Sequence, residues 1–110
     1  MAWLVHDNRV LASLEIADTA VRRGRGLLGR DGIEGAIWLP GTRSVHTIGM
    51  RFAIDVAFCD GDLTVVRVVT LRPNRVTRPM LRCRSAVETS AGMFARWGIG
   101  PGATLEMRGD

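Results

Sequence analysis

Hydrophobic and polar residues alternate along several segments of the chain, which is the pattern of β-strands that bury one face. The clearest of these segments is 52–59. Its large hydrophobic residues share one face, and they are Phe52, Ile54, Val56 and Phe58. The other face carries small residues and one acid, Asp55. We therefore expect the first face to lie in the core and the second to be covered by another part of the chain.

A second strand is expected directly after this one, over residues 63–72, and the loop between the two decides which residues share a face. A two-residue Asp60-Gly61 turn is a strong local signal. That turn would place Arg67 on the face of the phenylalanines, where burying a charge costs several kcal/mol unless it is paired. A loop with an odd number of residues instead puts Arg67 on the face of Asp55. We predict the odd loop, and with it a structural pair between Asp55 and Arg67.

Shorter strands are expected on both sides of this hairpin. Residues 3–18 predict two short strands around an Asp7-Asn8 turn. Further short strands are expected at 36–39, around 86–87 and at 102–107. Many short strands with one or two brief helices predict a mainly β sandwich or barrel.

Two short helices are expected among these strands. The first begins at Asp18 or Thr19, either of which can cap a helix, and ends at Gly29. The second is expected to begin at Ser90 and to end at Gly98. Its inward-facing residues are expected to be Phe94 and Trp97.

The length of 110 residues allows one core, so we expect a single domain over residues 1–110. No apolar run reaches the roughly 18 residues that a membrane helix needs, and polar residues at 6–9 interrupt the opening segment. We expect a cytoplasmic protein without a membrane span. Two cysteines, Cys59 and Cys83, are too few for a disulfide framework and are expected to be buried free thiols.

Charge is distributed unevenly along the chain. All fifteen basic residues are arginines, a composition that codon bias toward GC-rich codons also produces, and the net charge is +4. No acid lies between Asp62 and Glu88. Six arginines do, namely Arg67, Arg72, Arg75, Arg78, Arg82 and Arg84. This stretch predicts a basic surface.

Four blocks of sequence in this order resemble the DUF192 family of small uncharacterised proteins. The blocks are "RGRGLLGR", "RFAIDVAF", "LRP" and "AVETSAGMFARWGIGPG", and the resemblance covers about residues 18–107. It implies a mainly β, jelly-roll-like sandwich and no established activity. Two positions depart from the family pattern: Ala53 stands where proline is common, and Ala103 stands where an aspartate commonly follows the late glycine. A site that needs a carboxylate at position 103 is therefore not expected in this chain.

Candidate catalytic residues are few. His46 could act as an acid or base, with Asp55 or Glu88 as its carboxylate and Arg51 steadying negative charge. The alternative interpretation, which we favour, is structural: each acid is paired with an arginine, Asp55 with Arg67 and Glu88 with Arg51, Arg82 or Arg84. With two histidines and no HxH or HExxH pattern, neither a metal site nor a cofactor is expected.

The sequence favours a noncatalytic binding or accessory module over an enzyme. The basic region and the loop that carries His46 would together bind an anionic small molecule or a protein partner. The binding residues are expected to be His46, Arg51, Arg72, Arg75 and Arg82. Two alternatives stay open, a small enzyme built on His46 and a nucleic-acid binder that uses the basic region 67–84. Aromatic residues make up 5% of the chain and tyrosine is missing, which argues against nucleic-acid binding by base stacking.

Overall fold

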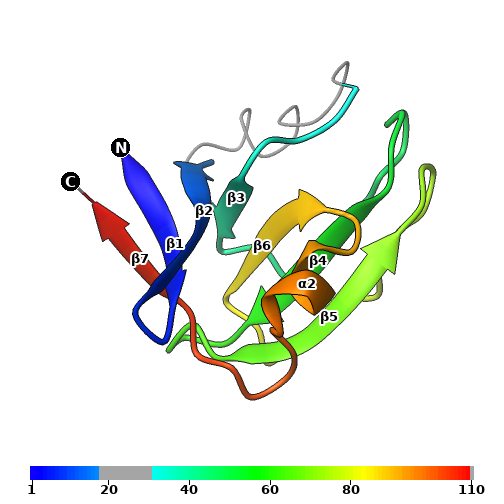
Figure 1. Ribbon diagram of the computed structural model, residues 1–110. Coiled ribbons are helices and arrows are strands. Elements are labelled where there is room, and N and C mark those ends of the chain that lie inside the picture. The colour runs from blue at the N-terminus through cyan, green and yellow to red at the C-terminus, as the bar shows by residue number, and fades with distance from the viewer. Residues whose placement is uncertain (18–30, 110) are drawn as a thin grey trace.

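The computed structural model describes residues 1–17 and 31–109 and contains mainly β-strands (Figure 1). The elements are β1 (Ala2–His6), β2 (Arg9–Ile16), β3 (Ala36–Pro40), β4 (Ile54–Cys59), β5 (Val65–Leu71), β6 (Ser85–Ser90), the short helix α2 (Met93–Trp97) and β7 (Glu106–Gly109). The mainly β fold expected from the sequence is confirmed. The helix expected between Asp18 and Gly29 lies outside the described residues.

The seven strands form one sheet in the order β5-β4-β6-β3-β2-β1-β7. Neighbouring strands are antiparallel except β2 and β3, whose parallel register joins Leu14 to Ala36. The sheet is not a closed barrel, but its two ends approach each other. A bridge between Thr64 and Thr104 joins the segments before β5 and β7, and the Val65 N–H donates to the Ala103 carbonyl at 2.7 Å.

The first hairpin follows directly from its turn residues. Asp7 and Asn8 have φ angles of 50° and 64°, as a two-residue type I′ turn requires, and Asn and Asp tolerate this left-handed conformation better than most residues. The expected turn is therefore confirmed. It sets the antiparallel register in which His6 faces Arg9.

A close approach at the parallel seam explains Gly35, which precedes β3. This glycine has a φ of +70°, and a Cβ there would lie 2.4 Å from Ser13 Oγ and 2.6 Å from the Ser13 carbonyl oxygen. Only glycine fits this position without a shift of β2. Gly41, at the other end of β3, has a similar φ of +73° but open space around it.

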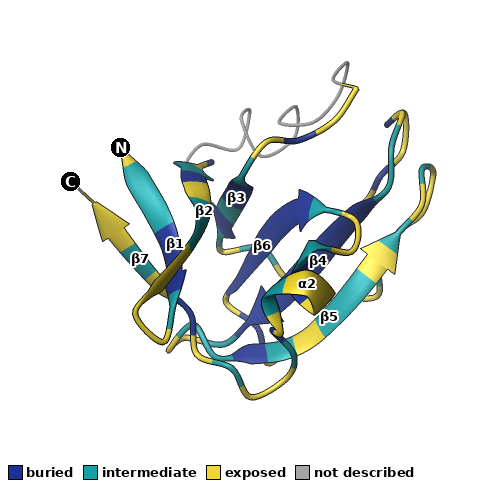
Figure 2. Ribbon diagram, in the orientation of Figure 1, coloured by how far each residue is buried: buried dark blue, intermediate teal, exposed yellow. Residues whose placement is uncertain are grey.

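The strand β4 is buried along its whole length and forms the centre of the core (Figure 2). On its first face, Ile54, Val56 and Phe58 pack against the loop segments 41–52 and 72–84. On its second face, Ala57 and Cys59 pack with Phe94 of α2, which is fully buried. A cover over the small-residue face was expected, and α2 provides part of it (Figure 1).

A β-bulge overturns the predicted register of the β4–β5 hairpin. The loop has an odd number of residues, 60–64, and Cys59 faces Val65 as expected, but the register then shifts and Phe58 faces Arg67. Beyond the bulge every β5 side chain lies on the opposite face from the one predicted. Arg67 thus shares a face with Phe58, and the predicted pair of Asp55 with Arg67 is wrong. The charge is accommodated because β5 is an edge strand, where the Arg67 side chain remains exposed.

The helix α2 is shorter than the sequence predicted. Its N-cap is Gly92, with a φ of 87°, and not Ser90. The Ser90 hydroxyl donates instead to the Ile33 carbonyl at 2.8 Å, which fixes the end of β6. Gly98 ends the helix in the left-handed conformation, as predicted. Phe94 is buried and Trp97 half-buried, with the two rings packed edge to face at 5.5 Å.

The last strand, β7, begins at Glu106, later than the predicted 102–107 strand. No helix in the part of the chain that the structure describes is long and apolar enough to cross a membrane.

Candidate functional site

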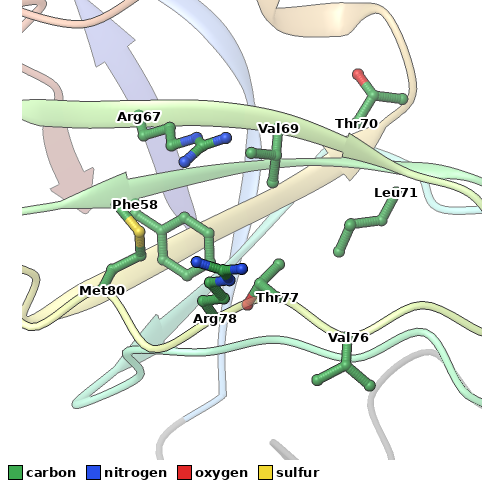
Figure 3. Close-up of a pocket in the computed structure, with 9 residues that line it drawn as sticks. All are labelled: Phe58, Arg67, Val69, Thr70, Leu71, Val76, Thr77, Arg78 and Met80. Atoms are coloured by element: carbon green, nitrogen blue, oxygen red, sulfur yellow. The ribbon is translucent and has the colours of Figure 1, made fainter.

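A pocket of about 490 Å³ opens on the first face of the sheet, between β5 and the segment 76–80 (Figure 3). Apolar side chains form much of its lining, from Phe58 of β4, Val69 and Leu71 of β5, and Val76 and Met80 of the facing segment. Two arginines, Arg67 and Arg78, enter it from opposite walls, and Thr77 adds to the lining. Thr70 borders the pocket, but its side chain points away from it (Figure 3). None of the described residues that line the pocket is acidic.

The β5 wall of the pocket depends on the bulge after Val65. Because the bulge turns Arg67, Val69 and Leu71 to the first face, they line the pocket together with Phe58. Without it, these three side chains would lie on the α2 side of the sheet. The bulge therefore builds one wall of the pocket.

The opposite wall is held in place by Thr47, a residue with no exposed surface. Its hydroxyl donates to the Arg72 carbonyl at 2.6 Å and accepts the Arg75 N–H at 2.9 Å. Its own N–H donates to the Arg75 carbonyl at 2.8 Å, and its carbonyl accepts the Asn74 N–H at 2.9 Å. Thr47 thus satisfies four groups in or beside the turn that leads into the pocket wall.

A second threonine ties the pocket wall itself to the 45–50 loop. The Thr77 hydroxyl accepts the Val45 N–H at 2.9 Å, and the Thr77 N–H donates to the Val45 carbonyl at 2.9 Å. The Asn74 side-chain oxygen accepts the Gly49 N–H at 3.0 Å. These bonds hold both loops in one arrangement, so the wall that carries Arg78 is formed before any ligand binds.

None of the five binding residues predicted from the sequence lines the described pocket. His46 is exposed, and its Nδ1 accepts the Ile48 N–H at 3.3 Å. Arg51 forms an exposed ion pair with Asp31 at 3.0 Å. The remaining three are exposed arginines of the loop 72–84, Arg72, Arg75 and Arg82. Their part in binding stays a prediction.

The structure does not bring together the proposed acid–base residues. Asp55 faces Thr89 across the β4–β6 ladder while Glu88 faces Val56, so the two carboxylates lie on opposite faces of the sheet. His46 lies on an exposed loop and makes no hydrogen bond or ion pair with either acid among the described residues. The described contacts therefore give no support to an acid–base site built from His46 with Asp55 or Glu88.

Asp55 has a structural role on the second face. One carboxylate oxygen accepts the Thr70 hydroxyl at 2.6 Å, and the other accepts the Phe94 N–H at 3.3 Å. Because Gly92 offers no side chain to cap α2, this carboxylate of β4 satisfies one of the free N–H groups of the first turn. Asp55 thereby joins β4, β5 and α2.

Glu88 is buried on the first face, between Ile37 of β3 and Val56 of β4. The expected arginine partner is not found: none of the described arginines forms an ion pair with it, and Arg51 pairs with Asp31 instead. Burial raises the pKa of the Glu88 carboxyl from its ordinary value of 4.5 to about 7.

The two cysteines are buried free thiols, as expected. Burial, with smaller effects from Cys83 and Asp60, raises the pKa of the Cys59 thiol from 9.0 to about 12. Within the described residues, no group of three or more His, Cys, Asp and Glu side chains is arranged to hold a metal ion.

The resemblance to a known family is borne out by comparison with other proteins. The model of the DUF192 family, described as "Uncharacterized ACR", matches residues 2–107. The chain belongs to the DUF192 family. A UPF0127 protein of Pyrococcus abyssi is 36% identical over 85 residues, which cover 73% of each chain. A UPF0127 protein of Pyrococcus horikoshii is 35% identical over 85 residues, which cover 73% of this chain and 74% of the relative.

Two solved structures share the fold of this DUF192 chain. A proposed transcription regulator from Sinorhizobium meliloti superposes with a TM-score of 0.79 at 20% identity, covering 96% of this chain and 91% of the other. A protein of unknown function from Novosphingobium aromaticivorans gives a TM-score of 0.78 at 18% identity, with 96% and 82% covered. At these identities the likeness concerns the fold alone.

Proposed function

We propose that this DUF192 protein is a noncatalytic binding module that takes an anionic ligand with an apolar portion into the pocket beside β5. The observation that carries the proposal is the pair Arg67 and Arg78 on opposite walls of an apolar pocket (Figure 3). Guanidinium groups bind carboxylate and phosphate through paired N–H donors. The apolar floor would bury the remainder of the ligand.

The free charge of the two arginines supports this assignment. No ion pair to a described acid involves Arg67 or Arg78, whereas Arg51 and Arg108 each have a carboxylate partner. The chain also contains no acid from 63 to 87. An incoming anion would therefore meet two cations without displacing a competing carboxylate.

The size and rigidity of the pocket also fit a binding role. A volume of about 490 Å³ falls in the range typical of small-ligand sites. Its outer wall is fixed by Thr47 and Thr77, so little conformational entropy would be lost when a ligand binds. A ligand that carries one anionic group and a short apolar chain would satisfy both parts of the lining.

Titration calorimetry with decanoate and decyl phosphate tests the proposal. Decanol, which keeps the apolar chain without the charge, and acetate, which keeps the carboxylate without the long chain, serve as partial ligands. We expect the two amphiphilic anions to bind and the two partial ligands to bind at least tenfold more weakly, since charged hydrogen bonds contribute about 1.5–3 kcal/mol each. Replacing both Arg67 and Arg78 by alanine should weaken decanoate binding by at least tenfold.

The matched control is Arg96→Ala, which removes an exposed arginine of α2 outside this pocket. Its affinity for decanoate should equal that of the unaltered protein. The proposal fails if neither amphiphile binds below micellar concentrations, if decanol binds as tightly as decanoate, or if Arg96→Ala weakens binding as much as the double substitution.

The two alternatives from the sequence receive less support. An enzyme built on His46 with Asp55 or Glu88 stays a prediction, but the Asp55 carboxylate already accepts hydrogen bonds from Thr70 and Phe94. Neither acid forms a hydrogen bond with His46 among the described residues. Nucleic-acid binding through the basic region stays a prediction, and a gel shift at low salt tests it, because phosphate contacts weaken steeply as salt rises. The cytoplasmic location also stays a prediction.

A further inference from the structure

Beyond its first residue, the outer edge of β5 pairs with no other segment that the structure describes. β5 is the last strand on its side of the sheet, and no other strand lies beyond it in Figure 1. At Val65 both backbone groups are paired on this edge: the N–H donates to the Ala103 carbonyl, and the carbonyl accepts the Gly102 N–H. From residue 66 to residue 71, no backbone hydrogen bond outside the β4 ladder is made to any described residue. An unpaired edge of this kind can accept another strand.

The pocket lies on the side-chain face directly beside this open edge. Arg67, Val69 and Leu71 alternate along β5 and point into it, while Val76 and Arg78 form the facing wall (Figure 3). A strand added to β5 would therefore place every second side chain between these walls. Recognition by strand addition has this form, with backbone bonds giving affinity and pockets for alternate side chains giving specificity.

The charge of the edge indicates which strand would bind. Arg67 projects from β5, Arg72 follows its end, and Arg78 lies across the pocket. A second copy of this chain would bring a second set of the same arginines to one interface, and like charges placed opposite each other on paired strands are destabilising. Acidic side chains at alternate positions would instead lie opposite the arginines.

We propose that the edge of β5 binds an extended segment of a partner protein with acidic side chains at alternate positions, which lie between Arg67 and Arg78. This inference rests on the proposed anion-binding pocket and names the class of its ligand. The segment pairs with residues 66–71 through its backbone, while its acidic residues take the place of the small anion.

A fluorescein-labelled peptide of five Val-Glu repeats tests the inference by fluorescence anisotropy. Two derivatives carry N-methyl groups, one on every valine nitrogen and the other on every glutamate nitrogen. In an added strand, alternate N–H groups point toward β5 and toward solvent. We expect one derivative to lose at least tenfold in affinity and the other to stay within twofold of the unmodified peptide.

Charge provides the second arm of the experiment. Five Val-Lys repeats should not bind, and Arg67→Glu should weaken the Val-Glu peptide at least tenfold. Arg96→Glu makes the same charge change on α2, outside the pocket, and should leave the affinity unchanged. Because Arg67 is exposed, both variants should fold, which a thermal melt verifies.

The outcomes separate this inference from the proposed function. If decanoate binds but the Val-Glu peptide does not, or if both N-methylated peptides bind equally well, strand addition is wrong and the pocket proposal stands. If neither decanoate nor the peptide binds, both are wrong. Sedimentation velocity tests the remaining alternative. A dimer that Arg67→Glu weakens and that the Val-Glu peptide does not displace would show that the edge binds a second copy of this chain instead.

Discussion

Glu88 makes the stability of this protein depend on pH in a direction that the structure predicts. Its carboxyl is buried on an apolar face of the sheet, with only 7% of the residue exposed, and burial raises its pKa from 4.5 to about 7. Between these two pH values the folded protein retains a proton that the unfolded chain has released. Raising the pH through this window therefore favours unfolding. The stability that the protonated Glu88 contributes is fully present below pH 4.5 and is lost as the pH rises through about 7.

The size of the effect follows from the same two values. Each pKa unit corresponds to about 1.4 kcal/mol, so a rise from 4.5 to about 7 amounts to about 3 kcal/mol. Glu88→Gln keeps nearly the same shape but cannot ionise. We expect the variant to differ little from the unaltered protein at pH 4 and to be more stable by about 3 kcal/mol at pH 8.

Urea unfolding followed by tryptophan fluorescence, at several pH values between 4 and 8.5, measures this difference directly. Glu34→Gln removes one exposed carboxylate and controls for the change in net charge. The decisive quantity is the difference in unfolding free energy between Glu88→Gln and the unaltered protein. If that difference is the same at pH 4 and pH 8, the carboxyl is not titrating in the window, and the reasoning from its burial is refuted.

Three further predictions concern the strands and the thiols. Asp55→Ala should destabilise the fold by about 3 kcal/mol, because it removes a charged acceptor from the buried Phe94 N–H and the part-buried Thr70 hydroxyl. Arg67→Ala should cost under about 0.5 kcal/mol. An equal cost of the two substitutions in urea unfolding would favour the Asp55–Arg67 pair after all. Gly35→Ala should lower the free energy of unfolding by about 1–3 kcal/mol more than Gly41→Ala, since both glycines have similar φ angles but only a Cβ at residue 35 would meet β2. Equal midpoints of the two variants in urea unfolding would show that the contact with β2 relaxes freely. Cys59 is fully buried, and its pKa is raised to about 12. At pH 8 it should react with a disulfide reagent at least about a hundredfold more slowly in the folded protein than in guanidinium. Comparable rates would show that β4 opens readily.

Local patterns in the sequence predicted much of the fold. The Asp7-Asn8 turn requires two residues that tolerate positive φ, and this sets the first hairpin. Alternation in 52–59 identified the buried faces of β4, and Gly98 marked the end of α2. In each case, neighbours within a few positions determine the conformation, so the sequence contains the information directly.

The register of β5 could not be predicted in the same way. The odd loop was the right expectation, but the bulge after Val65 has no local signature, and a single inserted residue exchanges the two faces of the strand. The exposed edge position of β5 removed the argument that Arg67 would be costly on the phenylalanine face. Strand order decides that point, and strand order depends on the whole chain.

The candidate site, like the fold, was predicted from the sequence only in part. A basic region was predicted, and the pocket is lined by two of its arginines, but the binding residues selected from the sequence did not include Arg67 and Arg78. Which arginines face the pocket depends on the bulge and on the bonds of Thr47 to the 72–75 turn. The buried position of Glu88 without an arginine partner among the described residues was also not predicted, because it depends on contacts across three strands.

The pairing of β1 with β7 has a consequence for how the chain folds. Ala2 faces Gly109 in the antiparallel register of these two strands. During synthesis the first hairpin therefore emerges long before its outer partner exists, and the β1 edge that pairs with β7 stays open until residues 106–109 are made. Contacts so distant in sequence also delay closure after dilution from denaturant, since the entropy of a long loop must be lost before they form. Among the described strands, the docking of β7 onto β1 should thus be the final step of folding.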